Sequence, residues 1–110
     1  EYISASPKVT KLRIEGHTST TGDDAKNQKL SEERSYAVAK WLVSKGGVDC
    51  NRLVPAGFGE TRLIVKPEKT DEDRARNRRV DFVNAAINGK PILGFPIDGG
   101  GKVSGDPCAE

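Results

Sequence analysis

The sequence is poor in the residues that bind metals and carry out redox chemistry. Its 110 residues include one histidine, His17, and two cysteines, Cys50 and Cys108. The cysteines are too far apart for the close paired spacing of zinc ligands or of a thioredoxin-like redox site. We therefore expect no metal and no cofactor.

Net charge and long apolar segments are also lacking. Eighteen basic and 16 acidic side chains leave a net charge of +2, which is too small to attract nucleic acid over a distance. The basic residues 74–79 are preceded by acidic residues 71–73 and have no interleaved aromatic side chains, so a nucleic-acid patch is not indicated.

No apolar stretch approaches the length that spans a bilayer. Membrane association is expected only through a part of the protein outside this chain.

Motifs of catalysis are missing as well. The pair Gly57-x-Gly59 lacks the third glycine and the strand-to-helix context of a dinucleotide fingerprint. There is no P-loop, no nucleophile elbow and no convincing Ser/His/Asp set. The sequence therefore predicts a binding protein and not an enzyme.

A first strand is indicated near the N-terminus. A chain of this length normally forms one domain with one modest core. Residues 9–15 alternate apolar with polar side chains, as in a strand with one buried face, and Gly16 ends the pattern. Val9 is out of step with Leu12, so the buried run is expected to begin at Leu12.

A long helix is predicted from about residue 24 to residue 45, with Asp23 or Asp24 as its N-cap. The apolar stripe, which also contains an arginine, follows helical spacing, and its members are Leu30, Arg34, Val38, Trp41 and Leu42. Trp41 is expected in the core. A second interpretation starts the helix at Ser31 and places Arg34 in its first turn. Both interpretations place Arg34 on or near the apolar stripe.

The second half of the chain alternates short elements with turns. Residues 52–57 read as a strand, in which Pro55 indicates an edge or a bulge. Thr70 or Asp71 is expected to cap a short helix that runs through residue 76, and a strand follows at residues 80–83. The glycine- and proline-rich residues 88–110 are expected to form an extended or loose appendage.

The two cysteines can form a disulfide or remain free thiols, and their even count favours the disulfide. A bond between Cys50 and Cys108 would tie the tail back to the domain. It would close a loop of about 58 residues, worth roughly 4 kcal/mol on the chain-entropy model. Such a bond indicates an oxidising compartment such as the periplasm.

Four polar signatures occur along the chain, at residues 12–18 (LRIEGHT), 27–34 (NQKLSEER), 56–60 (AGFGE) and 74–80 (RARNRRV). In this order and spacing they resemble the OmpA-like C-terminal domain family, which includes the peptidoglycan-associated lipoproteins and the periplasmic part of MotB.

The resemblance covers residues 8–84 and implies an α/β (α+β) two-layer sandwich, in which a mixed β-sheet carries helices on one face. The family begins with a strand and a helix, of which only residues 2–6 could represent the end of the helix, so the first strand is expected to be missing. We assign residues 1–87 to the OmpA-like domain and residues 88–110 to a C-terminal extension.

The resemblance also implies noncovalent binding of the peptidoglycan stem peptide through its diaminopimelate residue. Arg34 matches the family arginine that binds the carboxylate of this zwitterion, and its planar guanidinium suits a bidentate pair. Asn27 matches the asparagine that lines the site. Thr18 and Ser19 are further candidates, and Arg78 is preferred to its neighbour as the arginine that faces the site.

Ser19 departs from the family, which has an aspartate at this position to hold the ammonium group. A hydroxyl supplies no charge, so a charge-assisted contact becomes a weaker neutral one and affinity should fall roughly tenfold or more. Asp23 or Asp24 could compensate, or could simply cap the helix. His17 is expected to hydrogen-bond the adjacent loop.

Two functions follow from these residues. The first is a cell-wall anchor for an envelope protein, located in the periplasm and associated with the outer membrane or cell envelope. The second is an OmpA-like structural or protein-interaction module whose peptidoglycan binding is weak or lost because of Ser19.

Overall fold

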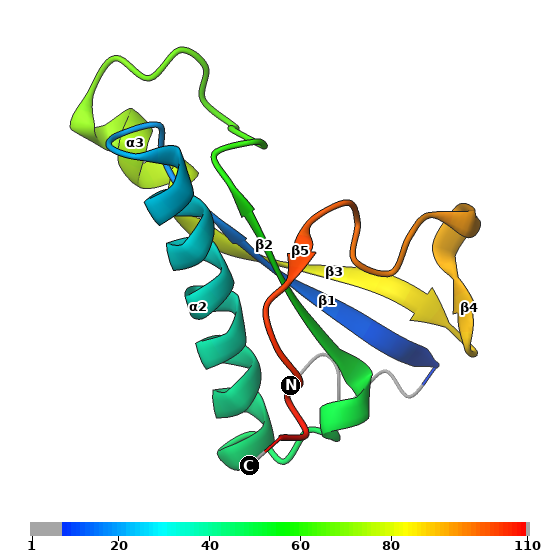
Figure 1. Cartoon of the computed structure of the whole chain (residues 1–110). Helices are drawn as coiled ribbons and strands as arrows, with labels where there is room; N and C mark the ends of the chain where they lie inside the picture. The colour runs from blue at the N-terminus through cyan, green and yellow to red at the C-terminus, as the bar shows by residue number, and fades with distance from the viewer. Residues whose placement is uncertain (1–7, 110) are drawn as a thin grey trace.

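A five-stranded mixed sheet with the order β4-β3-β1-β2-β5 forms the centre of the computed structural model (Figure 1). The structure describes residues 8–109. In chain order, its elements are β1 (Val9–His17), α2 (Asp24–Ser44), η1 (Cys50–Arg52), β2 (Leu53–Gly59), α3 (Asp71–Asn77), β3 (Arg79–Ile87), β4 (Lys90–Pro91), η2 (Ile92–Gly94) and β5 (Lys102–Val103). This α+β arrangement is the predicted fold class. The predicted absence of a first strand and the end of a first helix at residues 2–6 fall outside the described residues.

The central strand β1 pairs in parallel with β2 and antiparallel with β3. Its buried side begins at Val9, which is 5% exposed and belongs to the core. The expectation that burial begins only at Leu12 is therefore wrong. The pairing of β1 with β3 shifts register on both sides of Lys11, and such an irregularity brings Val9 to the same face as Leu12 despite its odd spacing.

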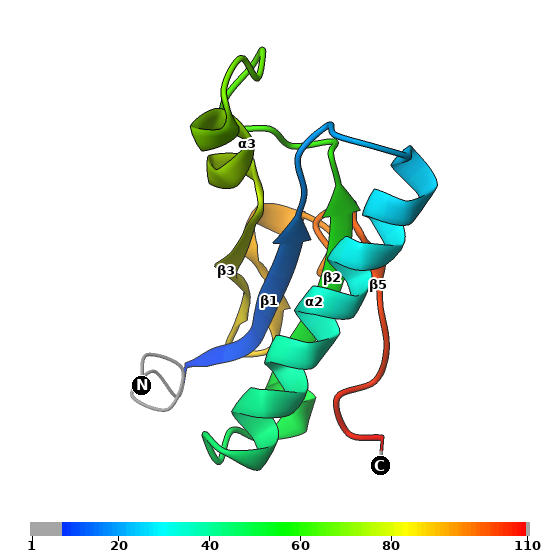
Figure 2. The same cartoon turned by 90° about the vertical axis from the view of Figure 1, so that its left-hand side faces the viewer.

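Helix α2 lies across one face of β1 and β2 (Figure 2). It begins after Asp23, so the interpretation that starts it at Ser31 is wrong. Its buried residues are Ser31, Ser35, Ala39 and Leu42. This row is displaced by one position from most of the predicted stripe, and Trp41 is 56% exposed instead of buried in the core.

Small side chains face the sheet because the helix approaches it very closely. A Cβ atom on Gly16 would overlap the main chain of Ser31, and one on Gly57 would lie 2.7 Å from the Ser31 hydroxyl. Such distances are possible only for glycine on the strand and for serine or alanine on the helix. The short distance between helix and sheet, and not hydrophobicity alone, selects the buried face of α2.

Strand β2 has β1 on one side and only the two residues of β5 on the other. Pro55 is buried, and its carbonyl oxygen accepts a hydrogen bond from the Ser104 N–H at 3.0 Å. The sequence predicted an edge or a bulge at Pro55, and β2 would be an edge strand without the C-terminal segment.

Thr70 caps α3 in a capping box with Asp73, and the helix ends at Asn77. The predicted cap and helix are thus confirmed. Strand β3 extends beyond the predicted residues 80–83 to Ile87. Among the described residues, no helix is long and apolar enough to cross a membrane.

The C-terminal segment packs against the domain. Its two-residue strands β4 and β5 pair with β3 and β2, at opposite edges of the sheet. A disulfide joins Cys108 to Cys50, at the start of η1 just before β2. Residues of the last stretch also bond to α2, where the hydroxyls of Ser35 and Ser104 lie 2.9 Å apart. The segment predicted to be extended or loose is therefore ordered against the sheet and the helix.

Candidate functional site

The connection between β1 and α2 begins with two buried hydroxyl residues. Thr18 is 2% exposed and Ser19 is 3% exposed. The Thr18 N–H donates to the Gly59 carbonyl at 2.9 Å, which fixes the start of the connection to the end of β2. The Ser19 hydroxyl accepts a hydrogen bond of 3.3 Å from the Thr21 N–H. Among residues 8–109, the buried Thr18 hydroxyl has no hydrogen-bond partner.

Asn27, in the first turn of α2, shapes this connection. Its side-chain Nδ2 donates to the carbonyl oxygen of Ser19 at 3.3 Å and to that of Thr21 at 3.0 Å. These bonds satisfy main-chain acceptors that no strand or helix would otherwise satisfy. The structure thus brings Asn27 and Ser19 together, and it uses the amide of Asn27 to position the connection.

Arg34 lies further along the same helix and is half-buried. Leu30 and Val38 are four residues before and after it, so apolar side chains flank its position on the helix surface. Within the part of the chain that the structure describes, its guanidinium has no hydrogen bond and no ion pair. A partly buried charge without a partner is unfavourable, and the guanidinium offers a planar fork of donors to an incoming anion.

The two aspartates before α2 differ in their contacts. Asp23 is the N-cap, and its carboxylate accepts hydrogen bonds from the N–H groups of Ala25 and Lys26 at 2.8 and 3.2 Å. Asp24 is exposed in the first turn of the helix. Of the two roles considered for Asp23, the structure shows helix capping.

Glu68 is a neighbour of this connection that sequence reasoning missed. Its Oε1 accepts hydrogen bonds from the Thr20 N–H at 3.0 Å and the Thr20 hydroxyl at 2.6 Å, and its Oε2 accepts one from Asn77 Nδ2 at 2.6 Å. Asn77 is fully buried and also bonds the main chain of residues 64 and 65. Forty-eight residues separate Glu68 from Thr20, so no local pattern indicated the contact.

Hydrogen bonds keep the Glu68 carboxylate ionised. Burial raises the pKa of Glu68, but the bonds from Thr20 and Asn77 and the charge of Arg74 outweigh this effect and hold the pKa below its ordinary value. A fixed negative charge therefore lies beside the residue that follows Ser19.

The two arginines before β3 are arranged differently. Arg79 pairs with Asp81 at 2.9 Å and donates to the Arg62 carbonyl at 3.0 Å. Arg78 is exposed, and its charge helps to lower the pKa of Asp71. Arg78 thus has the freer side chain of the two, but no contact in the described structure joins it to Arg34 or to the β1–α2 connection.

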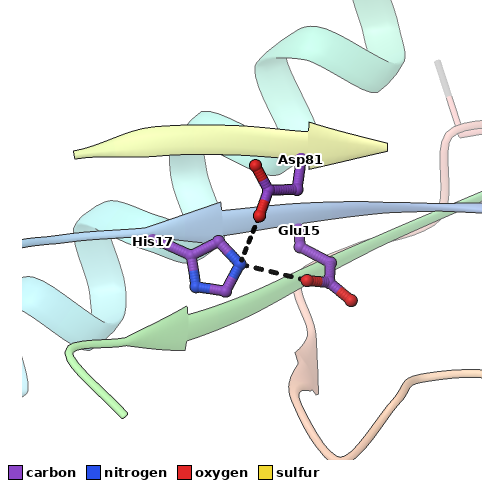
Figure 3. A group of neighbouring side chains, drawn as sticks. All are labelled: Glu15, His17 and Asp81. Carbon is purple, nitrogen blue, oxygen red and sulfur yellow. Dashed lines mark hydrogen bonds and ion pairs between the residues drawn. The ribbon is translucent and has the colours of Figure 1, made fainter. Parts of the chain in front are cut away.

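The group Glu15, His17 and Asp81 is the arrangement closest to a metal site among the described residues (Figure 3). His17 Nε2 lies 3.0 Å from Glu15 Oε1 and 3.6 Å from Asp81 Oδ2. The prediction that His17 bonds the adjacent loop is therefore wrong, because its partners are on β1 and β3.

The contacts of Glu15, His17 and Asp81 are those of an ion-pair network and not of a metal centre. Arg13 Nε donates to Glu15 at 2.6 Å and Arg79 Nε donates to Asp81 at 2.9 Å, so each carboxylate already has a cationic partner. Arg13 also donates to the Ile97 carbonyl at 3.1 Å. Because side chains alternate along a strand, this network lies on the opposite face of β1 from the core residues that meet α2.

Comparison with known proteins gives one family and several relatives. A sequence profile of the OmpA family matches residues 1–78. Outer membrane porin F of Pseudomonas aeruginosa is 47% identical over 72 residues, which are 66% of this chain and 20% of that protein. Outer membrane protein A of Bordetella avium is 48% identical over 67 residues, or 61% and 34% of the two chains.

A lipoprotein is also similar. Outer-membrane lipoprotein YfiB of Pseudomonas aeruginosa is 36% identical over 75 residues, which are 68% of this chain and 44% of that protein. The chain therefore spans less than half the length of each of these three relatives. All three are named as outer membrane proteins or lipoproteins, and none of the names denotes an enzyme.

Proposed function

This chain belongs to the OmpA family, whose domains are generally peptidoglycan-associated, and we propose that it binds the diaminopimelate residue of the peptidoglycan stem peptide noncovalently. The observation that carries this proposal is the half-buried guanidinium of Arg34, which has no partner among residues 8–109. A carboxylate of the ligand would supply the missing anion through a bidentate pair.

The β1–α2 connection forms the other side of the proposed site. Asn27 fixes the main chain of Ser19, so that the connection is preorganised before the ligand arrives. The Thr18 hydroxyl is a buried polar group of this connection that has no hydrogen-bond partner among the described residues. In this proposal the protein performs no catalysis, needs no cofactor and has no nucleic-acid partner. Its place is the periplasm, where it holds an envelope protein to the cell wall.

Sedimentation with purified peptidoglycan sacculi tests the proposal. The wild-type protein should sediment with the sacculi, and Arg34→Ala should sediment at least tenfold less strongly because a charge-assisted bidentate contact is lost. Arg34→Lys should bind weakly, since an ammonium group keeps the charge but not the planar fork. Arg76→Ala removes an equally charged, exposed arginine from α3 and serves as the control.

One observation favours a second function. Ser19 is buried and uncharged where the family resemblance implies an aspartate, so the domain could keep its fold as a structural or protein-interaction module without binding the wall. Equal and poor sedimentation of the wild type and Arg34→Ala would favour this second function and contradict the first.

A further inference from the structure

A zwitterionic head group presents an ammonium as well as a carboxylate, and in the proposed site only the carboxylate has a charged partner. Ser19 offers a hydroxyl, and this hydroxyl already accepts the Thr21 N–H. The following inference rests on the proposed function and concerns the group that binds the ammonium.

Glu68 lies outside the β1–α2 connection in the chain, but its carboxylate is hydrogen-bonded to that connection in the described structure. Its hydrogen bonds to the N–H and hydroxyl of Thr20 hold it at the residue directly after Ser19. In Figure 2, the β1–α2 connection lies between α3 and the beginning of α2. Asn77, at the end of α3, donates to the second oxygen of Glu68 at 2.6 Å.

The carboxylate of Glu68 has room for one more donor. Two oxygens offer about four acceptor positions, and Thr20 and Asn77 use three of them. The side chain is held in one place before a ligand arrives, so little ordering is needed on binding. An ammonium group can donate to the position that remains.

Three other nearby carboxylates already have partners. Asp23 caps α2 through two main-chain N–H groups. Asp73 accepts from the N–H groups of Lys69 and Thr70 in the capping box of α3. Glu15 pairs with Arg13 and His17 on the opposite face of the sheet. Asp24 and Glu60 have no side-chain hydrogen bond or ion pair among the described residues, and Asp24, in the first turn of α2, supplies a matched control.

We propose that Glu68 is the ammonium-binding carboxylate of this site. The zwitterion is then bound by Arg34 from α2 and by Glu68 from the segment that precedes α3. The negative charge comes from a residue 49 positions after Ser19 in the chain, so Ser19 itself need not supply one. Glu68 is thus a specificity-determining residue that selects a ligand with a free amine.

Sacculus sedimentation with four variants tests this assignment. Glu68→Gln should reduce binding about tenfold or more, because a charged hydrogen-bond acceptor becomes neutral. Asp24→Asn should bind like the wild type. The double variant Ser19→Asp/Glu68→Gln should recover binding, since it returns a negative charge to the same connection. Ser19→Asp alone should bind at least as strongly as the wild type.

A soluble ligand separates recognition of the ammonium from support of the loop. Binding of a diaminopimelate-containing stem peptide should be compared with binding of the same peptide acetylated on the free amine of diaminopimelate. The wild type should prefer the free amine by about tenfold, and Glu68→Gln should lose most of this preference. A purely structural role would weaken both peptides equally.

The outcomes distinguish this inference from the proposed function. If Arg34→Ala loses binding while Glu68→Gln keeps both its binding and its preference for the free amine, Glu68 does not bind the ammonium and the proposed function stands. Loss of binding in Asp24→Asn alone would likewise overturn the assignment to Glu68. If neither the wild type nor Ser19→Asp binds sacculi or stem peptide, the proposed function itself fails.

Discussion

The main chains of β1 and α2 meet where Gly16 faces Ser31. A side chain at residue 16 would overlap the Ser31 main chain, and the Ser31 hydroxyl accepts the Gly59 N–H at 2.9 Å. This contact fixes the rotation of the helix on the sheet. It places Ser31 and Ser35 underneath and leaves Arg34 half-buried on the flank, where a ligand can reach it.

Gly16→Ala should destabilise the domain by about 1–3 kcal/mol, the usual cost of forcing extra volume into a tightly packed contact. The helix must move away from the sheet to accept even one methyl group. Urea unfolding of the variant measures the loss, and Ser44→Ala at the exposed end of α2 is the control. An unchanged midpoint would mean that helix and sheet are less closely packed than the structure shows.

Asn77→Ala should destabilise the protein by about 1–3 kcal/mol, because part-buried main-chain groups lose their partner. The N–H groups of Ile64 and Val65 donate to Asn77 Oδ1 at 2.8 and 3.1 Å. The segment before α3 should also become more sensitive to limited proteolysis. Lys69→Ala, on the exposed part of the same segment, should change neither property.

The contribution of Glu15 to stability should disappear in acid. Burial raises the pKa of Glu15, but hydrogen bonds and charges from His17 and Arg13 outweigh burial and lower the pKa below its ordinary value. A carboxyl with a lowered pKa in the folded state stabilises the protein above its unfolded pKa of about 4.3. That stabilisation is lost as the pH falls through the folded pKa.

The difference in unfolding free energy between wild type and Glu15→Gln measures this effect. We expect the difference to be constant near neutral pH and to shrink below about pH 4. Glu33→Gln, an exposed change on α2, should show no such trend. A difference that stays constant down to pH 3 would show that Glu15 acts through its shape and not through its charge.

Removal of the disulfide should cost roughly 4 kcal/mol on the chain-entropy model, since Cys50 and Cys108 are 58 residues apart. Urea unfolding with and without a reducing agent gives the value. The double variant Cys50→Ser/Cys108→Ser should match the reduced protein, and the reducing agent should not affect it further. Equal stability of the oxidised and reduced protein would contradict the prediction.

Local patterns in the sequence were sufficient for most of the fold. The cap at Asp23, the capping box at Thr70 and the alternation along β1 depend on residues close in the chain, so they could be read directly. The register shifts around Lys11 could not, because they are set by pairing with β3, some seventy residues away in the chain. Val9 was therefore misplaced.

The face of α2 and the surroundings of the site depend on contacts that no local pattern contains. Apolar spacing pointed to Trp41, whereas the close approach to Gly16 selected serine and alanine on the adjacent row. Arg34, Asn27 and Ser19 were recognised from the family signatures, and their use as ligand-binding residues stays a prediction. Glu68 is brought to this region only by folding, through its hydrogen bonds to Thr20 and Asn77, and no sequence signature marked it.

The position of the disulfide determines how the domain would carry mechanical tension. The proposed site lies around the N-terminal half of α2, whereas Tyr36 and Lys40 bond the last residues of the chain near the other end of the helix. A pull between a bound wall fragment and Cys108 would pass through the disulfide to Cys50, which follows α2 in the chain. Strands β2, β3 and β5 lie between Cys50 and Cys108, inside the loop that the disulfide closes, so their pairing would be shielded from that load and α2 would carry it.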